Sequence, residues 1–169
     1  MSLSLYDITI PVFIHGLKTL SVNLEKGRSF AIANGMAHGE IISARLFPDM
    51  APLSAQIQRA SDTVRFVAVR VAQAEPKKMP DYEETFDELK GRIKATIDYL
   101  NLVKPDSMNG KENEPVVLKF GDRQLDLTAA SYIQKFALPN FYFHLTTAYG
   151  IMRHKGVPLG KLDFIGAIA

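Results

Sequence analysis

The stretch Tyr6–Leu24, "YDITIPVFIHGLKTLSVNL", repeats apolar residues at alternating intervals of four and three. The repeated positions are Tyr6, Ile10, Phe13, Leu17, Leu20 and Leu24. Because an α-helix makes one turn in about 3.6 residues, this spacing places all of these side chains on one face. The stretch therefore predicts a long amphipathic helix that packs in a helical bundle. We expect Pro11 to bend its first turns and Gly27 to end it.

Two further stretches repeat this rhythm, and each predicts a helix of the same kind. Their apolar positions are Leu53, Ile57, Ala60, Val64, Val67 and Val71 in one, and Phe86, Leu89, Ile93, Ile97 and Leu100 in the other. We expect Pro52 in the first turn of the former, with Asp49 accepting hydrogen bonds from its free amides. Asp81 and Glu84 have the spacing of a capping box before the latter. Residues 28–50 are expected to form a crossing connection with one or two short helices.

The period changes to two after a polar loop at residues 104–115. In "VVLKFGDRQLDLT", apolar and polar residues alternate on both sides of Gly121 and Asp122, which predicts a small β-hairpin. A fourth helix is expected from residue 128 or 129 to about Lys155, with a kink at Pro139 and a stop at Gly156. The tail after it is apolar enough to pack on the bundle or on a second subunit.

These elements together predict the fold class. We expect an all-α protein with a single domain over residues 1–169. Its architecture is an antiparallel four-helix bundle, and a small β-hairpin is inserted before the last helix. Bundles build their binding sites between the helices from inward-pointing side chains, so candidate functional residues are sought there.

The composition argues against several classes of protein. The chain has 20 Lys and Arg against 18 Asp and Glu, and the two kinds are interleaved, so we expect no nucleic-acid partner. The absence of cysteine excludes disulfides, thiolate catalysis and Cys-zinc sites. The first residues do not have the pattern of a signal peptide, and no apolar run is long enough to cross a bilayer. We therefore expect a cytoplasmic protein with no membrane partner.

Polar residues interrupt the apolar face of the last helix in "LPNFYFHLTTAYGIMRHKG", residues 138–156. Asn140, His144 and Thr147 recur at helical spacing and so share one face. Ile133 and Ala137 extend this face toward the start of the helix and indicate that it faces the core. We therefore expect the three polar side chains to point into the bundle.

Three interpretations of His144 stay open. It is a hydrogen-bonded core histidine, since buried polar groups normally find partners. Alternatively, His144 and Asn140 orient a ligand in a small-molecule pocket. The third interpretation is a divalent metal site that His144 shares with Asp49 or Gln56, although a transition metal usually takes at least three protein ligands.

Arg45, Asp49 and Arg153 form a second polar set. If the second long helix runs antiparallel to the last one, its start lies near the end of the last helix. Asp49 and Arg153 are then expected to meet, either as a structural salt bridge or as part of a site for an anionic ligand.

Four stretches resemble the DinB/YfiT-like superfamily of helical bundles and, within it, an uncharacterised bacterial domain family. They are "RLFPDM" at 45–50, "LKFG" at 118–121, "FALPNFYFH" at 136–144 and "AYGIMRHKGVPLGKLDFIG" at 148–166. The resemblance implies a four-helix bundle with a hairpin before the last helix, often dimeric. It implies no established activity.

The resemblance also bears on metal binding. Many members of the superfamily are thought to bind a divalent metal through one histidine of the second helix and a His-x3-His pair of the last. Here His144 matches the first of the pair, Ala148 stands at the second position, and residues 52–74 contain no histidine. We therefore expect a degenerate metal site, no cofactor, and a homodimer with a small pocket near His144 and Asn140. Two alternatives stay open: a metal-dependent hydrolase or thiol-dependent transferase, and a homodimeric partner-binding module that uses the apolar tail.

Overall fold

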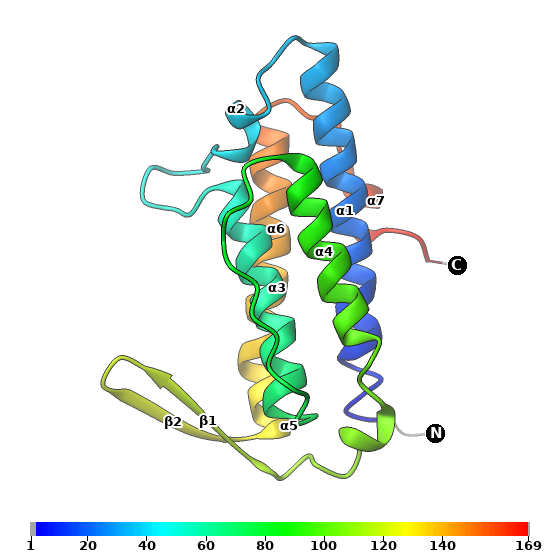
Figure 1. The fold of residues 1–169 in the computed structure, drawn as a ribbon, viewed down its shortest axis with the longest axis vertical. Helices are drawn as coiled ribbons and strands as arrows, with labels where there is room; N and C mark the ends of the chain where they lie inside the picture. Colours follow the sequence, from blue (N-terminus) through cyan, green and yellow to red (C-terminus); the bar gives the residue numbers. More distant parts are fainter. Residues whose placement is uncertain (1–2, 169) are drawn as a thin grey trace.

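The computed structural model describes residues 3–168 and arranges four long helices in a bundle (Figure 1). These helices are α1 (Ile10–Ala33), α3 (Leu53–Arg70), α4 (Phe86–Leu100) and α6 (Leu138–His154). The short helical elements are α2 (Gly39–Ile42), η1 (Pro105–Ser107), α5 (Ala129–Tyr132), η2 (Ile133–Ala137) and α7 (Lys161–Ile165). The expected fold class, a four-helix bundle with a small hairpin before the last helix, is confirmed. No described helix is long and apolar enough to span a membrane.

The core lies where the predicted apolar stripes of the long helices meet. The stripe residues of α1 and α3 are buried, apart from Tyr6, which precedes α1 and is half-buried. In α4 the stripe is also buried except for Ile97, which is half-buried. Phe13 of α1 meets Phe141 of α6 edge to face, with 5.0 Å between the ring centroids. Burial of these stripes supplies the main driving force for folding.

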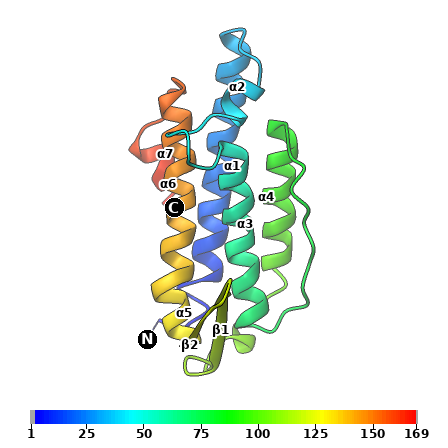
Figure 2. The ribbon, with the colours of Figure 1, turned by 90° about the vertical axis from the view of Figure 1, so that its left-hand side faces the viewer.

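The helices α1 and α6 run in one direction, and α3 and α4 run in the other (Figures 1 and 2). The ion pairs Lys90–Glu25 and Arg28–Asp87 join α1 and α4 in opposite order along the two helices. The pair α3–α6 is antiparallel as expected, whereas α3 and α4 are parallel. The expectation of an antiparallel bundle is therefore wrong for α3 and α4.

Residues 71–85, which we call the strap, make this parallel arrangement possible. The strap carries the chain along the outside of the bundle from the end of α3 back to the start of α4 (Figures 1 and 2). It must cover the length of a helix of 18 residues, which is about 27 Å. The capping box that starts α4 consists of Thr85 and Glu88, and the expected box of Asp81 and Glu84 is wrong.

Two expectations for α1 are also wrong. Pro11 lies in the first turn, where the helix has no hydrogen bond for it to break, so no bend is needed. Gly27 does not end the helix but is buried within it, and a Cβ there would lie 3.3 Å from Cε1 of Phe86. The glycine thus allows Phe86 at the start of α4 to approach α1. The left-handed residue after the helix is Gly35, with φ of 62°.

The predicted hairpin consists of β1 (Pro115–Phe120) and β2 (Arg123–Thr128), paired antiparallel. Gly121, with φ of 58°, and Asp122 form the two-residue turn between the strands. Val116 and Leu118 of β1 are buried, while most of β2 is exposed. β1 therefore anchors the hairpin to the helices, and β2 is mostly exposed to solvent.

The fourth helix consists of three consecutive segments, α5, η2 and α6. The middle segment η2 is a π-helix, in which the Leu138 N–H donates to the Ile133 carbonyl five residues back. A wider turn before Pro139 suits a residue that has no N–H and that clashes with the carbonyl four residues earlier. The distortion expected at Pro139 thus takes the form of a π turn. The helix stops at Gly156, with φ of 93°, as predicted.

The described part of the tail contacts α1 of the same chain. Nε2 of His15 is hydrogen-bonded to the Ile165 carbonyl at 2.7 Å, and Lys26 forms an ion pair with Asp163. Packing on the bundle is one of the two arrangements expected for the tail. Packing on a second subunit stays a prediction.

Candidate functional site

A row of polar side chains, which we call the seam, joins α3 to the antiparallel fourth helix, formed by α5, η2 and α6 and called the last helix below. Three hydrogen bonds cross the seam: Arg70 Nη1 to Tyr132 Oη at 3.0 Å, Asn140 Nδ2 to Thr63 Oγ1 at 2.7 Å, and His144 Nδ1 to Gln56 Oε1 at 2.8 Å. The partners follow each other in opposite order on the two helices, as antiparallel packing requires. The seam therefore satisfies polar groups that would otherwise be costly to bury.

The seam determines which ring nitrogen of His144 carries the proton. Gln56 donates its Nε2 to the Ala51 carbonyl at 2.9 Å, so its Oε1 faces His144 and accepts from Nδ1–H. Nε2 then keeps its lone pair. Burial, and next the positive charge of Arg59, lower the pKa of His144 to about 4. The imidazole is therefore neutral at neutral pH.

This pKa predicts how stability depends on pH. In the unfolded chain the imidazole binds a proton below about pH 6.5, and in the folded chain only near pH 4. His144 therefore makes its full contribution to the free energy of unfolding above about pH 6.5. This contribution is lost progressively as the pH falls toward about 4. Over this range the free energy of unfolding of the wild type is expected to fall by about 2 kcal/mol relative to that of His144→Gln. This value is below the one that the full pKa difference implies, because the ring borders a cavity that is open to solvent. Urea midpoints of both proteins measure this difference, and parallel pH profiles would contradict it.

A cavity of about 670 Å³ lies beside the seam, within the size range of small-molecule sites. Three elements line it: α3 with Arg59, Asp62, Thr63, Phe66 and Arg70, β1 with Leu118, Lys119 and Phe120, and the last helix with Tyr132, Phe136, Asn140 and His144. The π segment η2 contributes Phe136, and π turns often occur at functional sites. The cavity thus combines aromatic surfaces, cations and uncharged polar groups.

Aromatic rings form the apolar part of this cavity. Phe136 stacks on Tyr132 with a centroid distance of 5.9 Å and an interplanar angle of 18°. Its other aromatic neighbour is Phe120 of the hairpin, at 5.7 Å. Phe66 and Phe120 are 44% and 48% exposed, so a ligand that covers them would remove apolar surface from water.

Four predicted site residues of the bundle interior lie along the seam or close to it. Asn140 and His144 line the cavity, and Gln56 supports His144. Thr147 is buried, but its hydroxyl donates to the Phe143 carbonyl of its own helix at 2.8 Å. Thr147 therefore has a helix-internal partner and does not line the cavity.

The second predicted set is not brought together. Among the described residues Asp49 forms no ion pair with Arg153, whose Nη1 donates to the Val157 carbonyl at 2.8 Å. Arg45 donates to the Met50 carbonyl. The loop between α2 and α3 instead contacts α6 through the apolar residue Leu46. A Cβ at Gly150 of α6 would lie 3.3 Å from Cδ1 of Leu46. The expected contact between Asp49 and Arg153 is therefore wrong.

Asp49 does not cap α3 either. The first residue before the helix is Pro52, no side chain caps it, and the Leu53 N–H donates to the Ala44 carbonyl at 3.0 Å. The expected capping role of Asp49 is therefore wrong, because the preceding loop supplies a backbone carbonyl in its place.

Residues 5–165 match the model of a family described as a domain of unknown function, DUF1993. This chain belongs to the DUF1993 family. A crystal structure of a DinB family member protein from Shewanella denitrificans is 32% identical, with a TM-score of 0.87 over 97% of this chain and 93% of that one. The predicted membership of an uncharacterised family of DinB-like bundles is confirmed. Among proteins with curated descriptions, none matches significantly.

The three-histidine metal site of the wider superfamily does not fit the residues of this DUF1993 domain. Within residues 3–168 no three His, Cys, Asp or Glu side chains are grouped as a metal site requires. Nδ1 of His144 is engaged by Gln56, and Ala148 stands one turn later on α6. A divalent transition metal usually takes three or more protein ligands, and here one histidine faces an amide.

Sequence reasoning missed the α3 wall of the cavity. Arg59, Phe66 and Arg70 belong to a second stripe on this helix, which also contains Gln56 and Thr63. Its members recur at intervals of three, four, three and four, directly beside the apolar stripe. This periodicity is visible in the sequence and indicates a face that is in contact but not purely apolar.

Proposed function

We propose that this DinB-like protein binds a small organic molecule in the cavity between α3, β1 and the last helix, without a resident metal. The observation that carries the proposal is an aromatic cavity bordered by a seam of inward-pointing polar groups. Ligand pockets commonly combine apolar walls with a few polar groups that orient the ligand.

The orienting groups are the unused acceptors of the seam. Asn140 donates its Nδ2 to Thr63, and within residues 3–168 neither its Oδ1 nor Nε2 of His144 has a hydrogen-bond partner. Both residues line the cavity, so a ligand hydroxyl or amine can donate to them. An imidazole with a pKa of about 4 is a weak base and is not protonated at neutral pH. The site is therefore better suited to binding than to acid–base catalysis.

A single tryptophan tests the proposal, because the chain contains none. Phe136→Trp places a fluorophore in the cavity, and Phe47→Trp places one on the surface, where the native side chain is 64% exposed. The probe is N-phenyl-1-naphthylamine, a neutral aromatic amine that accepts energy from tryptophan. We expect saturable transfer with about one equivalent of probe, more efficient in Phe136→Trp than in Phe47→Trp because the first tryptophan lies in the cavity. Absent or equal transfer in the two variants would contradict the proposal.

A second variant fills the cavity. Asn140→Phe introduces a ring at a half-buried position, and its former partner Thr63 still donates its hydroxyl to the Arg59 carbonyl at 2.7 Å. We expect the variant to fold, as judged by circular dichroism, and to lose probe binding when combined with Phe136→Trp. Undiminished binding in the folded variant would place the probe elsewhere.

Three other expectations from the sequence stay predictions: a single domain, a homodimer and a cytoplasmic location. The metal-dependent hydrolase or transferase is disfavoured by the donor set around His144. For a partner-binding module, sedimentation of the chain shortened after Gly156 is the informative measurement. Unchanged assembly would exclude the tail as an interface.

A further inference from the structure

We propose that the ligand of this cavity is an amphiphilic organic anion, with a flat apolar body and a carboxylate, sulfonate or phosphate group held by Arg70. This inference rests on the proposed small-molecule function and adds the charge, the shape and the orientation of the ligand.

The charges that line the cavity are mostly positive. Arg59, Arg70 and Lys119 line it, and within residues 3–168 none of the three forms an ion pair with a carboxylate. The acidic residue of the lining is Asp62, whose Oδ1 accepts hydrogen bonds from two guanidinium groups outside the lining. The cavity therefore has an excess of cations without counterions, which favours an anionic ligand.

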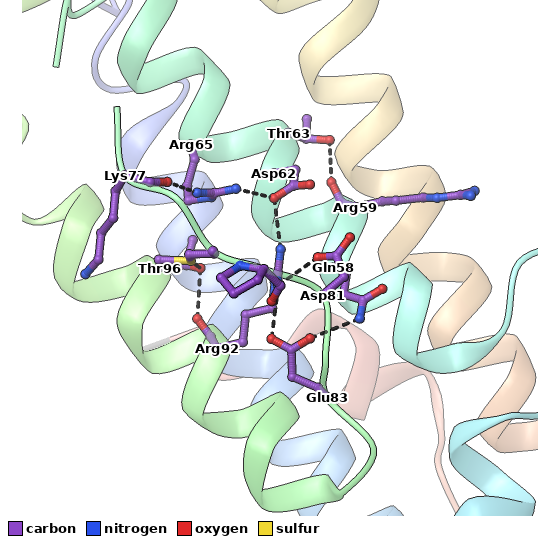
Figure 3. A network of polar contacts seen from close by, with 12 residues as sticks. Gln58, Arg59, Asp62, Thr63, Arg65, Lys77, Asp81, Glu83, Arg92 and Thr96 are labelled. Atoms are coloured by element: carbon purple, nitrogen blue, oxygen red, sulfur yellow. Dashed lines mark hydrogen bonds and ion pairs between the residues drawn. The ribbon is translucent and has the colours of Figure 1, made fainter. Parts of the chain in front are cut away.

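Figure 3 shows how Asp62 is neutralised. Its carboxylate lies between Arg65 and Arg92, and Nη2 of Arg92 is 3.0 Å from its Oδ1. The Arg59 side chain extends away from this network, toward the side on which α6 lies. Asp62 thus has its own cationic partners and does not neutralise the cations of the cavity.

Arg70 is held in an orientation suited to an anion. Its Cζ lies 4.6 Å above the centroid of the Phe66 ring, and its Nη1 donates to the Tyr132 hydroxyl at 3.0 Å. The remaining N–H groups of Arg70 have no partner within residues 3–168. A planar guanidinium with free donors is the preferred partner for two oxygens of one carboxylate or phosphate.

Tyr132 holds Arg70 from the core side, because its side chain is fully buried and its hydroxyl oxygen lies against the guanidinium. Its oxygen accepts from Arg70, and among the described residues its own proton has no acceptor. Burial raises the pKa of Tyr132, so the hydroxyl keeps its proton at neutral pH. A neutral hydroxyl orients the guanidinium without cancelling its positive charge, which stays available to an anion.

The positions along the last helix give the orientation of the ligand. Tyr132 and Asn140 are separated by eight residues, which corresponds to about 12 Å of helix. Phe136 lies halfway between them. An anionic group at Arg70 beside Tyr132, a flat ring on Phe136 and a donor at the Asn140 amide oxygen therefore match a two-ring aromatic acid or a molecule of similar length.

Two probes that differ by one anionic group test this inference in the Phe136→Trp background. The pair is 8-anilino-1-naphthalenesulfonate and N-phenyl-1-naphthylamine, which lacks the sulfonate. We expect the sulfonate to bind at least about tenfold more tightly than the neutral probe, and Arg70→Met to remove this difference between the two affinities. Tyr132→Phe, which removes the hydroxyl that orients Arg70 without a charge change, is expected to reduce the preference by roughly fivefold.

Lys104→Gln is the matched control, because it removes one positive charge from an exposed loop outside the cavity lining. It should leave both affinities unchanged. If the neutral probe binds and the sulfonate has no advantage, the inference fails while the proposed function stands. If neither probe binds, the proposed function fails. A preference that survives Arg70→Met, or that Lys104→Gln reduces equally, would overturn the anion site at Arg70.

Discussion

Phe141→Ala is expected to lower the free energy of unfolding by about 4 kcal/mol. The Phe141 side chain is fully buried between α6 and α1 and meets the Phe13 ring at 5.0 Å. Gly16 lies one turn later on α1, and a Cβ there would be only 2.7 Å from Cε1 of Phe141. Because Gly16 has no side chain to move into the space, removal of the ring leaves a cavity that collapses poorly. Urea denaturation measures the loss.

The control is Phe143→Ala, the same substitution two residues later on the same helix. Phe143 is 56% exposed, so its removal is expected to cost less than about 1 kcal/mol. Helix propensity changes equally in both variants, and the difference between them therefore reports burial. Similar losses for the two variants would show that Phe141 is not part of the core.

Arg92→Met is expected to destabilise the protein by about 3–5 kcal/mol, since it breaks a buried charge network and leaves acids unpaired. The side chain of Arg92 is 1% exposed and lies within 3.0 Å of oxygens of Asp62, Asp81 and Glu83 (Figure 3). Burial raises the pKa of Glu83, but hydrogen bonds from Gln58 and Arg92 outweigh it and hold the pKa below its ordinary value. Without Arg92, a carboxylate that is 3% exposed keeps the hydrogen bond from Gln58 but loses its cationic partner.

Lys94→Met on the same helix serves as the control. Lys94 pairs with Asp98 on the surface, with side chains 78% and 56% exposed, so its loss is expected to change stability by no more than about 0.5 kcal/mol. Urea midpoints of the two variants give the comparison. Equal effects would mean that the buried network contributes no more than a surface ion pair.

The strap provides a second measurement for Arg92→Met. Arg92 also donates to the Pro80 carbonyl at 3.2 Å, and Arg65 donates to the Lys77 carbonyl, so the network holds the strap against the bundle. Trypsin cleavage after Lys77 or Lys78 under native conditions is therefore expected to accelerate in Arg92→Met and not in Lys94→Met. An unchanged cleavage rate would show that other contacts hold the strap.

Several features of the site follow from local periodicity and were predictable. Asn140 and His144 share a helix face with buried apolar residues, so their direction is determined by the helix itself. The hydrogen-bond partners of these side chains are harder to predict from the sequence. The sequence offers Gln56 as one of several candidate partners and gives no indication of Thr63, because a helix face does not specify which residue of a neighbouring helix lies opposite.

The start of α4 shows that local capping rules alone allow two alternative capping boxes. Asp81–Glu84 and Thr85–Glu88 have the same spacing, and both precede the same apolar stripe. The strap decides between them, because Arg92 holds Asp81 and Glu83 and thereby keeps the chain extended until Thr85. The actual start of α4 thus depends on ion pairs that the spacing of the two candidate boxes does not reveal.

The sequence by itself determined the four long helices, the hairpin with its two-residue turn and the end of the last helix at Gly156, because each depends on interactions over a few residues. The tertiary structure decided that α3 and α4 are parallel and that Asp49 and Arg153 stay apart. It also decided that α3, β1 and the last helix enclose one cavity. These outcomes depend on packing between segments far apart in the chain, where the shape and burial of many side chains act together and no local period specifies the partner.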